Sequence, residues 1–424
     1  MTTPPSTHPH RRRSLYPSLL SVAVCAAVLT GCGQTATDQD HSASASCVDT
    51  SSDTIKVGSL NSLSGTMSIS EVTVRDATKL AVDEINSRGG VLGKKIDLVG
   101  EDGASDPAVF AQKADKLIRE DCVAAIFGAW TSPSRKAMLG TLEDNNSLLY
   151  YPVQYEGLET SKNVFYTGAT ANQQIVPALD YLKDEKKIST LYIVGSDSVF
   201  SRTAGRIVRA YAQAHGIDIK GEDYVQFGST DFSTVVSKIR QSNANAVFNT
   251  INGDSNVAFF REVKNTNLTP AQMPIMSVSI GEEEVAGIGA DNVAGELTAW
   301  DYYQTLDNPR NAAFVAAYKS RFGASKPTSD PMEAAYVAVY LWKNTVEKAK
   351  SFATDDVRKA SGGVTFDAPE GLVTIDGENQ HVYKTARIGE IGPDGLIRTI
   401  WDSGKPIQPD PYLTSYPWAK GLSS

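Results

Sequence analysis

Apolar positions follow two spacings along the chain from about residue 54 onward. Short apolar runs, such as residues 55–60 and 123–127, have the length of β-strands, whereas apolar positions three and four apart over residues 74–85 are typical of a helix. The two kinds of run alternate in a first block up to about residue 153 and again over residues 191–278. Because such alternation is typical of parallel sheets with right-handed crossovers, we predict two doubly wound α/β lobes.

The C-terminal part of the chain lacks this alternation. It contains two long helical patterns with no strand between them, residues 309–322 and 330 to about 349, and then a β-hairpin over residues 385–401. We expect the helices to return to the first lobe and the hairpin to the second, so that several crossings form a hinge beside an interlobe cleft. The expected boundaries are 54–168 with 298–350 for lobe 1, and 169–297 with most of 351–424 for lobe 2.

The first 32 residues have the pattern of a lipoprotein export signal. A basic segment, Arg11–Arg13, precedes about 10 apolar residues, roughly half the length that a membrane-spanning helix needs. Leu29-Thr30-Gly31-Cys32 has the form of a lipobox, which predicts cleavage before Cys32 and attachment of lipid to it. We expect residues 33–53 to be a flexible tether and the protein to be exported and lipid-anchored to the outer face of the cytoplasmic membrane. General secretion and the twin-arginine route both remain open.

The remaining cysteines and the charge balance add two expectations. Cys25 lies in the export signal and Cys32 would carry lipid, which leaves Cys47 and Cys122 in an oxidising compartment. We expect these two to form a disulfide, with two free thiols as the alternative. The net charge of −9 argues against nucleic acid as a partner.

Sequence patterns of enzymes and metal sites are missing. Beyond the tether the sequence contains only His215 and His381, and it has no HxxxH or CxxC pair, no GxSxG and no phosphate-binding glycine loop. We therefore expect a protein that is not an enzyme and that uses neither a metal nor a cofactor.

Polar and aromatic residues follow the strands of the first block, where doubly wound sheets bind ligands. After the third strand, Ser132 is expected to cap a helix whose free N–H groups would bind a carbonyl oxygen or an anion, and Trp130 to form a flat wall. After the next strand, residues 149–157 contain three tyrosines and Gln154, which would suit a compact polar ligand. Purely structural roles in capping and packing remain the alternative for both groups.

Three junctions of the second block offer further candidates: residues 195–200, 252–255 and 279–282. Asp254 and Ser255 are equally suited to capping a helix. The run Glu282–Glu284 is equally consistent with a first helical turn that the helix dipole stabilises.

Five segments carry a resemblance to a known family. The opening "IKVGSLNSLSG…DATKLAVDEINSRGGVLGKKIDLVGEDGASDP" resembles the leucine- and branched-chain-amino-acid-type (type I) periplasmic binding proteins. "FGAWTSPSRKAML", "LLYYPVQYEGLE", "FNTINGDSNVAFFREV" and "TSDPMEAAYVAVYLW" resemble the urea-binding subunit of urea ABC importers, which is related to the bacterial short-chain amide sensor. The resemblance covers about Thr54 to Leu422. It implies the type I two-lobed fold, urea or a short amide as the ligand, and an ABC permease in the membrane as the partner.

The resemblance also implies a set of ligand contacts: Trp130, Thr131, Ser132, Tyr151, Val153, Gln154 and Tyr155 from lobe 1, and Ser198, Phe200, Asp254, Ser279 and Glu282 from lobe 2. The chain departs from the subgroup at Ser198, where "GSDYVFPR" usually places a tyrosine, and this puts the affinity and the identity of the ligand in doubt. Binding of a branched-chain amino acid and an exported amide-sensing role are the alternatives. Amino-acid binders of this fold commonly have a Gly-Ala-Thr-like stretch where this chain has the bulkier residues 151–154, which favours a smaller ligand.

Overall fold

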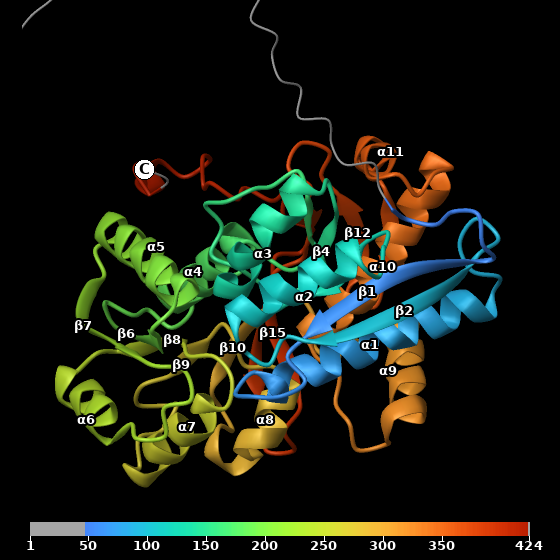
Figure 1. The fold of residues 1–424 in the computed structure, drawn as a ribbon. Helices are drawn as coiled ribbons and strands as arrows, with labels where there is room; N and C mark the ends of the chain where they lie inside the picture. Colours follow the sequence, from blue (N-terminus) through green and yellow to red (C-terminus); the bar gives the residue numbers. More distant parts are fainter. Residues whose placement is uncertain (1–46, 423–424) are drawn as a thin grey trace, which may run out of the picture. The chain divides into compact units, whose positions relative to one another are not determined.

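Two sheets organise residues 47–422, the part of the chain that the computed structural model describes (Figure 1). The sheet of lobe 1 is wholly parallel, in the order β2-β1-β3-β4-β5. Its strands are β1 (Thr54–Asn61), β2 (Lys95–Asp102), β3 (Ile126–Gly128), β4 (Leu149–Tyr151) and β5 (Val164–Tyr166).

The sheet of lobe 2 has seven strands in the order β15-β14-β10-β9-β8-β6-β7. Five are parallel, and the hairpin β14–β15 extends the sheet antiparallel to β10. They are β6 (Thr190–Ser196), β7 (Asp218–Val225), β8 (Ala246–Thr250), β9 (Ile275–Ser277), β10 (Leu297–Trp300), β14 (Arg387–Ile391) and β15 (Ile397–Asp402). The prediction of two doubly wound parallel-sheet lobes is confirmed.

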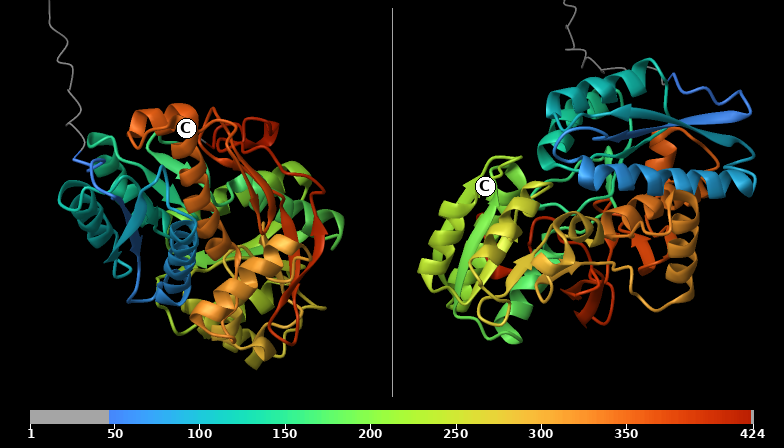
Figure 2. Two further views of the ribbon diagram at one scale, coloured as in Figure 1. Left: turned by 90° about the vertical axis from the view of Figure 1, so that its right-hand side faces the viewer. Right: turned by 90° about the horizontal axis from the view of Figure 1, so that it is seen from below.

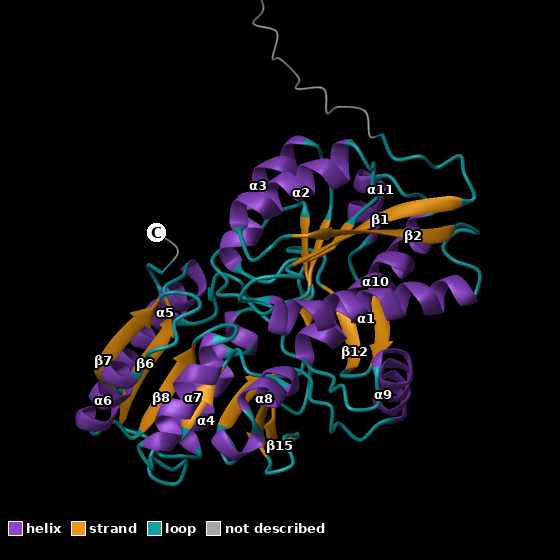
Figure 3. Cartoon of the chain, turned by 60° about the horizontal axis from the view of Figure 1, so that its bottom comes forward, coloured by secondary structure: helices purple, strands orange, loops and turns teal. Residues whose placement is uncertain are grey.

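Helices flank both sheets (Figure 3). Lobe 1 carries α1 (Ser68–Ser87), α2 (Pro107–Arg119) and α3 (Ser132–Asp144), together with α9 (Pro309–Phe322), α10 (Asp330–Ala349) and α11 (Thr354–Ala360). Lobe 2 carries α4 (Ile175–Asp184), α5 (Val199–His215), α6 (Ser233–Ser242), α7 (Ser255–Asn265) and α8 (Glu282–Ile288), and the 3-10 turns are η1 (Ala171–Gln173), η2 (Ala290–Asn292) and η3 (Pro417–Ala419). The apolar positions at helical spacing in α1 are buried: Val74, Ala77, Leu80, Ala81 and Ile85.

The C-terminal third divides between the lobes differently from the expectation. After β10, helices α9 and α10 lie beside α1 of lobe 1 (Figure 2), and Val337 and Leu341 of α10 join the core that contains β1. A small antiparallel sheet follows, made of β11 (Thr365–Ala368), β12 (Gly371–Ile375) and β13 (Val382–Tyr383). It packs on lobe 1 because the apolar side chains of Val373 and Ile375 complete the same core. Of these C-terminal strands, only β14 and β15 join the sheet of lobe 2.

A buried charge cluster joins the crossing segments. The Lys384 Nζ atom lies 2.6 Å from Glu370 Oε1 and 3.8 Å from Asp301 Oδ2, with all three side chains almost wholly excluded from solvent. Asp330, at the start of α10, accepts hydrogen bonds from the backbone N–H groups of Asp301 (3.0 Å) and Tyr302 (2.9 Å). Because a buried charge that loses its partner is costly, these contacts fix where the chain leaves one lobe for the other.

Cys47 and Cys122 are joined by a disulfide, with their Cα atoms 5.3 Å apart. The bond connects the segment before β1 to the segment before β3, and these two strands are neighbours in the sheet. Cys25, Cys32 and the lipobox lie outside the described residues. None of the helices in the described part of the chain is long and apolar enough to span a membrane.

Removing the disulfide should destabilise the fold without changing it. It closes a loop with a sequence separation of 75 residues, so the chain-entropy model predicts a loss of about 4 kcal/mol for the double variant Cys47→Ser/Cys122→Ser. Differential scanning calorimetry of the oxidised parent and the double variant measures this. Adding reductant should lower the melting temperature of the parent only; an equal effect on both would contradict the prediction.

Glu296 predicts a pH dependence of stability. Burial raises the pKa of its carboxyl from 4.5 to about 8, although Oε2 accepts a hydrogen bond from the Ile275 N–H at 2.7 Å. Between these pH values the folded protein keeps a proton that the unfolded chain releases, so the stability falls as pH rises, by about 1.4 kcal/mol per pH unit for one such group. In thermal unfolding between pH 5 and pH 8, Glu296→Gln should therefore lose less stability than the parent. If the stability of the two proteins fell equally with rising pH, Glu296 would not be the group that carries this proton.

Candidate functional site

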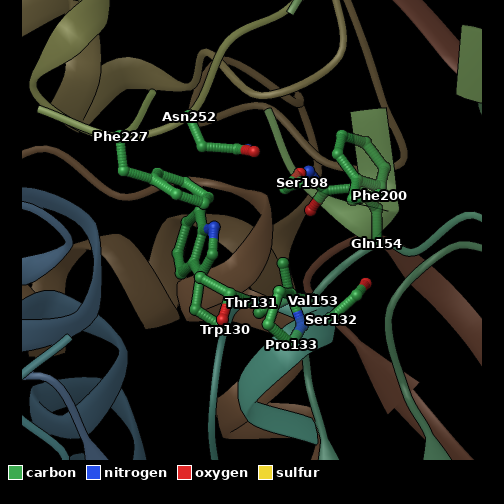
Figure 4. A pocket seen from close by; sticks show the side chains of 10 residues that line it. All are labelled: Trp130, Thr131, Ser132, Pro133, Val153, Gln154, Ser198, Phe200, Phe227 and Asn252. Atoms are coloured by element: carbon green, nitrogen blue, oxygen red, sulfur yellow. The ribbon is translucent and has the colours of Figure 1, made fainter. Parts of the chain in front are cut away.

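A cavity between the two lobes is lined by ten residues, all drawn in Figure 4. Lobe 1 contributes the loop between β3 and α3 and the residues after β4; lobe 2 contributes the start of α5 and the loops after β7 and β8. The free space amounts to about 260 Å³, part of it open to solvent. The lining residues are Trp130, Thr131, Ser132, Pro133, Val153, Gln154, Ser198, Phe200, Phe227 and Asn252.

Most of the residues expected at the ligand line this cavity, and three lining residues were not expected: Pro133, Phe227 and Asn252. Asn252 belongs to a junction that the sequence does indicate, but there the acidic Asp254 is the more obvious candidate. Phe227 follows the edge strand β7, whose side chains are only partly buried, so no apolar pattern marks its loop. Figure 4 shows its ring beside the indole of Trp130, and it packs against the lobe 1 cluster that includes this tryptophan.

A sharp bend places Trp130 at the cavity. Gly128 ends β3 with a φ of +126°, and Ala129 also has a positive φ, of +63°. A side chain at Gly128 would collide with the backbone carbonyl of Leu60 in β1, so this position requires glycine. The bend turns the chain directly into α3 and leaves Trp130 only 3% exposed at the cavity wall.

Thr131, not Ser132, caps helix α3. Thr131 has an extended backbone and its hydroxyl oxygen accepts the Ser134 N–H at 3.1 Å, so Ser132 is the first helical residue. Both residues are good caps, which is why the sequence places the cap one residue late. The Ser132 hydroxyl is used elsewhere: it donates to Glu156 Oε2 at 2.5 Å and accepts from Arg135 Nη1 at 3.2 Å.

Arg135 forms a buried ionic cluster below this end of α3. Its side chain is wholly buried, and its guanidinium lies 3.3 Å from Glu156 and 2.8 Å from Glu159. Burial alone would lower the pKa of Arg135, but the two carboxylates outweigh this effect and raise it. The guanidinium also lies over the rings of Tyr151 and Tyr155, 4.9 and 4.7 Å from their centres.

Tyr151 and Tyr155 therefore do not line the cavity. The Tyr151 hydroxyl donates to the backbone oxygen of Trp130, and the Tyr155 hydroxyl lies 2.6 Å from Nε2 of His381. Burial lowers the pKa of His381 to about 4, and its ring stacks on Tyr166 at 4.2 Å. The tyrosines belong to an aromatic layer beneath the site because the guanidinium of Arg135 attracts their ring faces. Val153 and Gln154, beyond the end of β4, are the residues of this segment that reach the cavity.

Two side-chain amides meet at Ser279, which lies behind the cavity wall. Gln154 Nε2 donates to the Val278 carbonyl at 2.9 Å and to the Ser279 hydroxyl at 3.0 Å, which joins lobe 1 to lobe 2. Asn252 Nδ2 donates to the same hydroxyl at 2.8 Å. Oε1 of Gln154 is buried and has no hydrogen-bond partner. This carbonyl oxygen can therefore accept a further hydrogen bond.

Asp254 and Glu282 lie away from the cavity. Asp254 lies at the start of α7, where its exposed carboxylate accepts a hydrogen bond from the Thr66 hydroxyl of lobe 1. Glu282 opens α8, and its Oε1 accepts the Gln304 N–H at 2.8 Å. Burial raises the pKa of Glu282 to about 8. Glu283 and Glu284 are buried as well, and the three residues form the first turn of α8, which is the alternative to a ligand contact that the sequence leaves open.

The cavity presents no ionisable side chain to a ligand. Among its ten lining residues none is Lys, Arg, His, Asp or Glu. Within residues 47–422, no group of three or more His, Cys, Asp or Glu side chains is arranged to hold a metal ion. The polar groups at the cavity are amides, hydroxyls and an indole, and the remaining walls are apolar.

A cavity between two doubly wound lobes is the arrangement of a binding protein, and a comparison with protein families agrees. The model of the periplasmic binding protein domain matches residues 55–417. The chain belongs to this family. It is thus a solute-binding protein of the extracytoplasmic type, and it is not an enzyme.

Curated relatives of this family member are named for amino acids. "Leu/Ile/Val-binding protein homolog 8" of Brucella abortus is 24% identical over 376 residues, 83% of this chain and 92% of that protein. The "Leucine-, isoleucine-, valine-, threonine-, and alanine-binding protein" of Pseudomonas aeruginosa is 24% identical over 327 residues, 76% and 86% of the two chains.

Solved structures of binding proteins share the fold. A solute-binding protein of an ABC transporter from Rhodopseudomonas palustris, solved with 4-hydroxybenzoate, has a TM-score of 0.76 and 24% identity, over 85% of this chain and 100% of that one. A leucine-binding protein from Thermotoga maritima has a TM-score of 0.73 and 20% identity, over 82% and 98% of the chains. The expectation of the two-lobed fold of type I periplasmic binding proteins is confirmed, whereas none of these relatives is named for urea.

Proposed function

We propose that this binding protein captures a small neutral amide, either urea or a short-chain amide, and delivers it to an ABC permease. The observation that carries the proposal is the buried, unpartnered Oε1 of Gln154 in a cavity lined by no ionisable side chain. This oxygen can accept a hydrogen bond from a ligand N–H, and the absence of an opposing charge favours a ligand that is itself neutral.

The other polar groups of the cavity complement an amide. No described residue donates to Oδ1 of Asn252, whose Nδ2 is bonded to Ser279, so a second acceptor remains for a ligand N–H. No described residue accepts from the indole N–H of Trp130, and Figure 4 places this nitrogen on the cavity side of the ring. It is a donor for a ligand carbonyl, and the flat indole suits a planar molecule.

The affinity expected for so small a ligand follows from its number of atoms. Urea has four non-hydrogen atoms, and the best very small ligands gain about 1.5 kcal/mol per atom, roughly 6 kcal/mol in all. This corresponds to a Kd on the order of tens of μM.

An organic acid is the second candidate, and the named relatives favour it. The rings of Trp130, Phe200 and Phe227 would suit an aromatic acid, and several relatives are named for branched-chain amino acids. A carboxylate, however, lacks a cation here: Arg135 is wholly buried and already paired with Glu156 and Glu159. The α-ammonium group of an amino acid would likewise find no carboxylate among the lining residues.

Calorimetry of the tether-free protein with urea, acetamide, leucine and 4-hydroxybenzoate tests the proposal. We expect the amides to bind most tightly and Gln154→Met to weaken urea binding by about 10- to 100-fold, because it removes the acceptor. Gln174→Met is a matched control: Gln174 is buried and also donates to the Val278 carbonyl, at 3.2 Å, but it does not line the cavity. Tighter binding of leucine or 4-hydroxybenzoate than of either amide would overturn the proposal.

We also propose that lipid on Cys32, outside the described residues, holds the protein at the outer face of the cytoplasmic membrane. Cys32→Ser should move the protein from the membrane fraction to the soluble fraction, as measured by cell fractionation and immunoblotting. Cys25→Ser is the matched control, because Cys25 lies within the export signal and would be removed with it. Retention of Cys32→Ser in the membrane fraction would show that another contact anchors the protein.

A further inference from the structure

Ser279 occupies a position from which it can control the chemistry of the cavity without touching it. It is 2% exposed and does not line the cavity, yet its hydroxyl receives N–H groups from Gln154 of lobe 1 and Asn252 of lobe 2. Each of these residues has a side-chain amide with one accepting end and one donating end. The end of each amide that is hydrogen-bonded to Ser279 determines which end is left to face a ligand.

The orientation of Gln154 follows from its partners. The Val278 backbone carbonyl can only accept a hydrogen bond, so the nitrogen of Gln154 must point toward it, and the second proton of this nitrogen reaches Ser279. The oxygen has no described donor, and because Gln154 lines the cavity, it is the end of this amide that remains for a ligand. Val278 and Ser279 thus both favour the orientation of Gln154 in which its nitrogen points toward them.

The orientation of Asn252 depends on Ser279 alone among its side-chain partners. Its backbone N–H is bonded to the Ser196 hydroxyl at 3.0 Å, and the one hydrogen bond of its side chain among the described residues goes to Ser279. A hydroxyl oxygen has two lone pairs, and here Gln154 and Asn252 fill both. With Ser279 accepting from both, the oxygen of Asn252 also faces the cavity.

We propose that Ser279 is a positioning residue for ligand specificity: it holds the amide nitrogens of Gln154 and Asn252 behind the wall, so that two oxygens select a ligand rich in N–H groups. This inference rests on the proposed amide-binding function and adds the residue that enforces it. An acceptor-only ligand of the same shape would face two carbonyl oxygens and would be rejected by repulsion and by unpaired acceptors.

The acetamide-to-acetate affinity ratio tests the inference, because the two molecules have nearly the same shape and differ in their N–H donors and in charge. None of the variants below changes a charge, so a change in the ratio between parent and variant reports on the N–H groups. Both Kd values are measured by calorimetry for the parent and for Ser279→Ala, Ser279→Thr and Ser277→Ala. In Ser279→Ala the Asn252 amide is free to turn its nitrogen to the cavity, so the preference for acetamide should fall at least 10-fold. Ser279→Thr keeps the hydroxyl and should keep the preference.

Ser277→Ala is the matched control. Ser277 is also buried, and its hydroxyl also accepts an asparagine amide, from Asn249 at 3.1 Å, but neither residue lines the cavity. A general loss of folding or of lobe closure would weaken both ligands equally and leave the ratio unchanged. An unchanged ratio in Ser279→Ala, with the parent still preferring acetamide, would overturn this inference alone. A parent that binds no amide would overturn the proposed function, and this inference with it.

Discussion

The burial of the Arg135 guanidinium constrains the side of lobe 1 that faces the cavity. A cation without solvent is tolerated only with partners at close range, and Glu156 and Glu159 supply them from the segment after β4. Because Arg135 belongs to the first turns of α3, this ion pairing joins the two loops that reach the cavity. Ser132 hydrogen-bonds to both Arg135 and Glu156, so the helix start and the loop cannot move independently.

The aromatic layer follows from the same charge. The rings of Tyr151 and Tyr155 cover the guanidinium, and their hydroxyl groups then reach the Trp130 carbonyl and His381. The hydrogen bond from Tyr151 thus fixes the backbone of Trp130, whose side chain lines the cavity. A wall fixed in this way costs little ordering entropy when a ligand of only a few atoms binds, which matters because such a ligand offers little binding energy.

The sequence predicts the architecture well because the fold depends on patterns that repeat many times. Short apolar runs identify β1 and β6, and apolar positions three and four apart identify α1. The ends of β3 and β4 lead to residues that line the cavity. The small sheet β11–β13 lies in a stretch that the sequence led us to expect mostly in lobe 2. Its strands are short, and what attaches them to lobe 1 is the packing of Val373 and Ile375 against a core whose other members are far away in sequence.

Individual site residues were harder to predict because the sequence shows which residue types follow a strand but not which way each side chain points. Tyr151 is suitable in type and position, but its ring lies against Arg135. Asp254 is the conspicuous acidic residue of its junction, whereas the neutral Asn252 two positions earlier reaches the cavity. The acidic run at the start of α8 is buried, and hydrogen bonds compensate for this burial. Glu282 accepts the backbone N–H of Gln304, and Glu284 accepts the backbone N–H of Gly281 and the hydroxyl of Ser70.

The two lobes meet at the cavity through hydrogen bonds that do not involve a ligand. Gln154 of lobe 1 donates to Val278 and Ser279 of lobe 2, and Phe227 of lobe 2 packs against the cluster of lobe 1 that contains Trp130. Both described acceptors of the Gln154 nitrogen, the Val278 carbonyl and the Ser279 hydroxyl, belong to lobe 2. The direction of this lobe 1 amide is therefore set by lobe 2. An amide that points its nitrogen at lobe 2 has only its oxygen left for other donors, so the chemistry that Gln154 offers depends on how the two lobes meet.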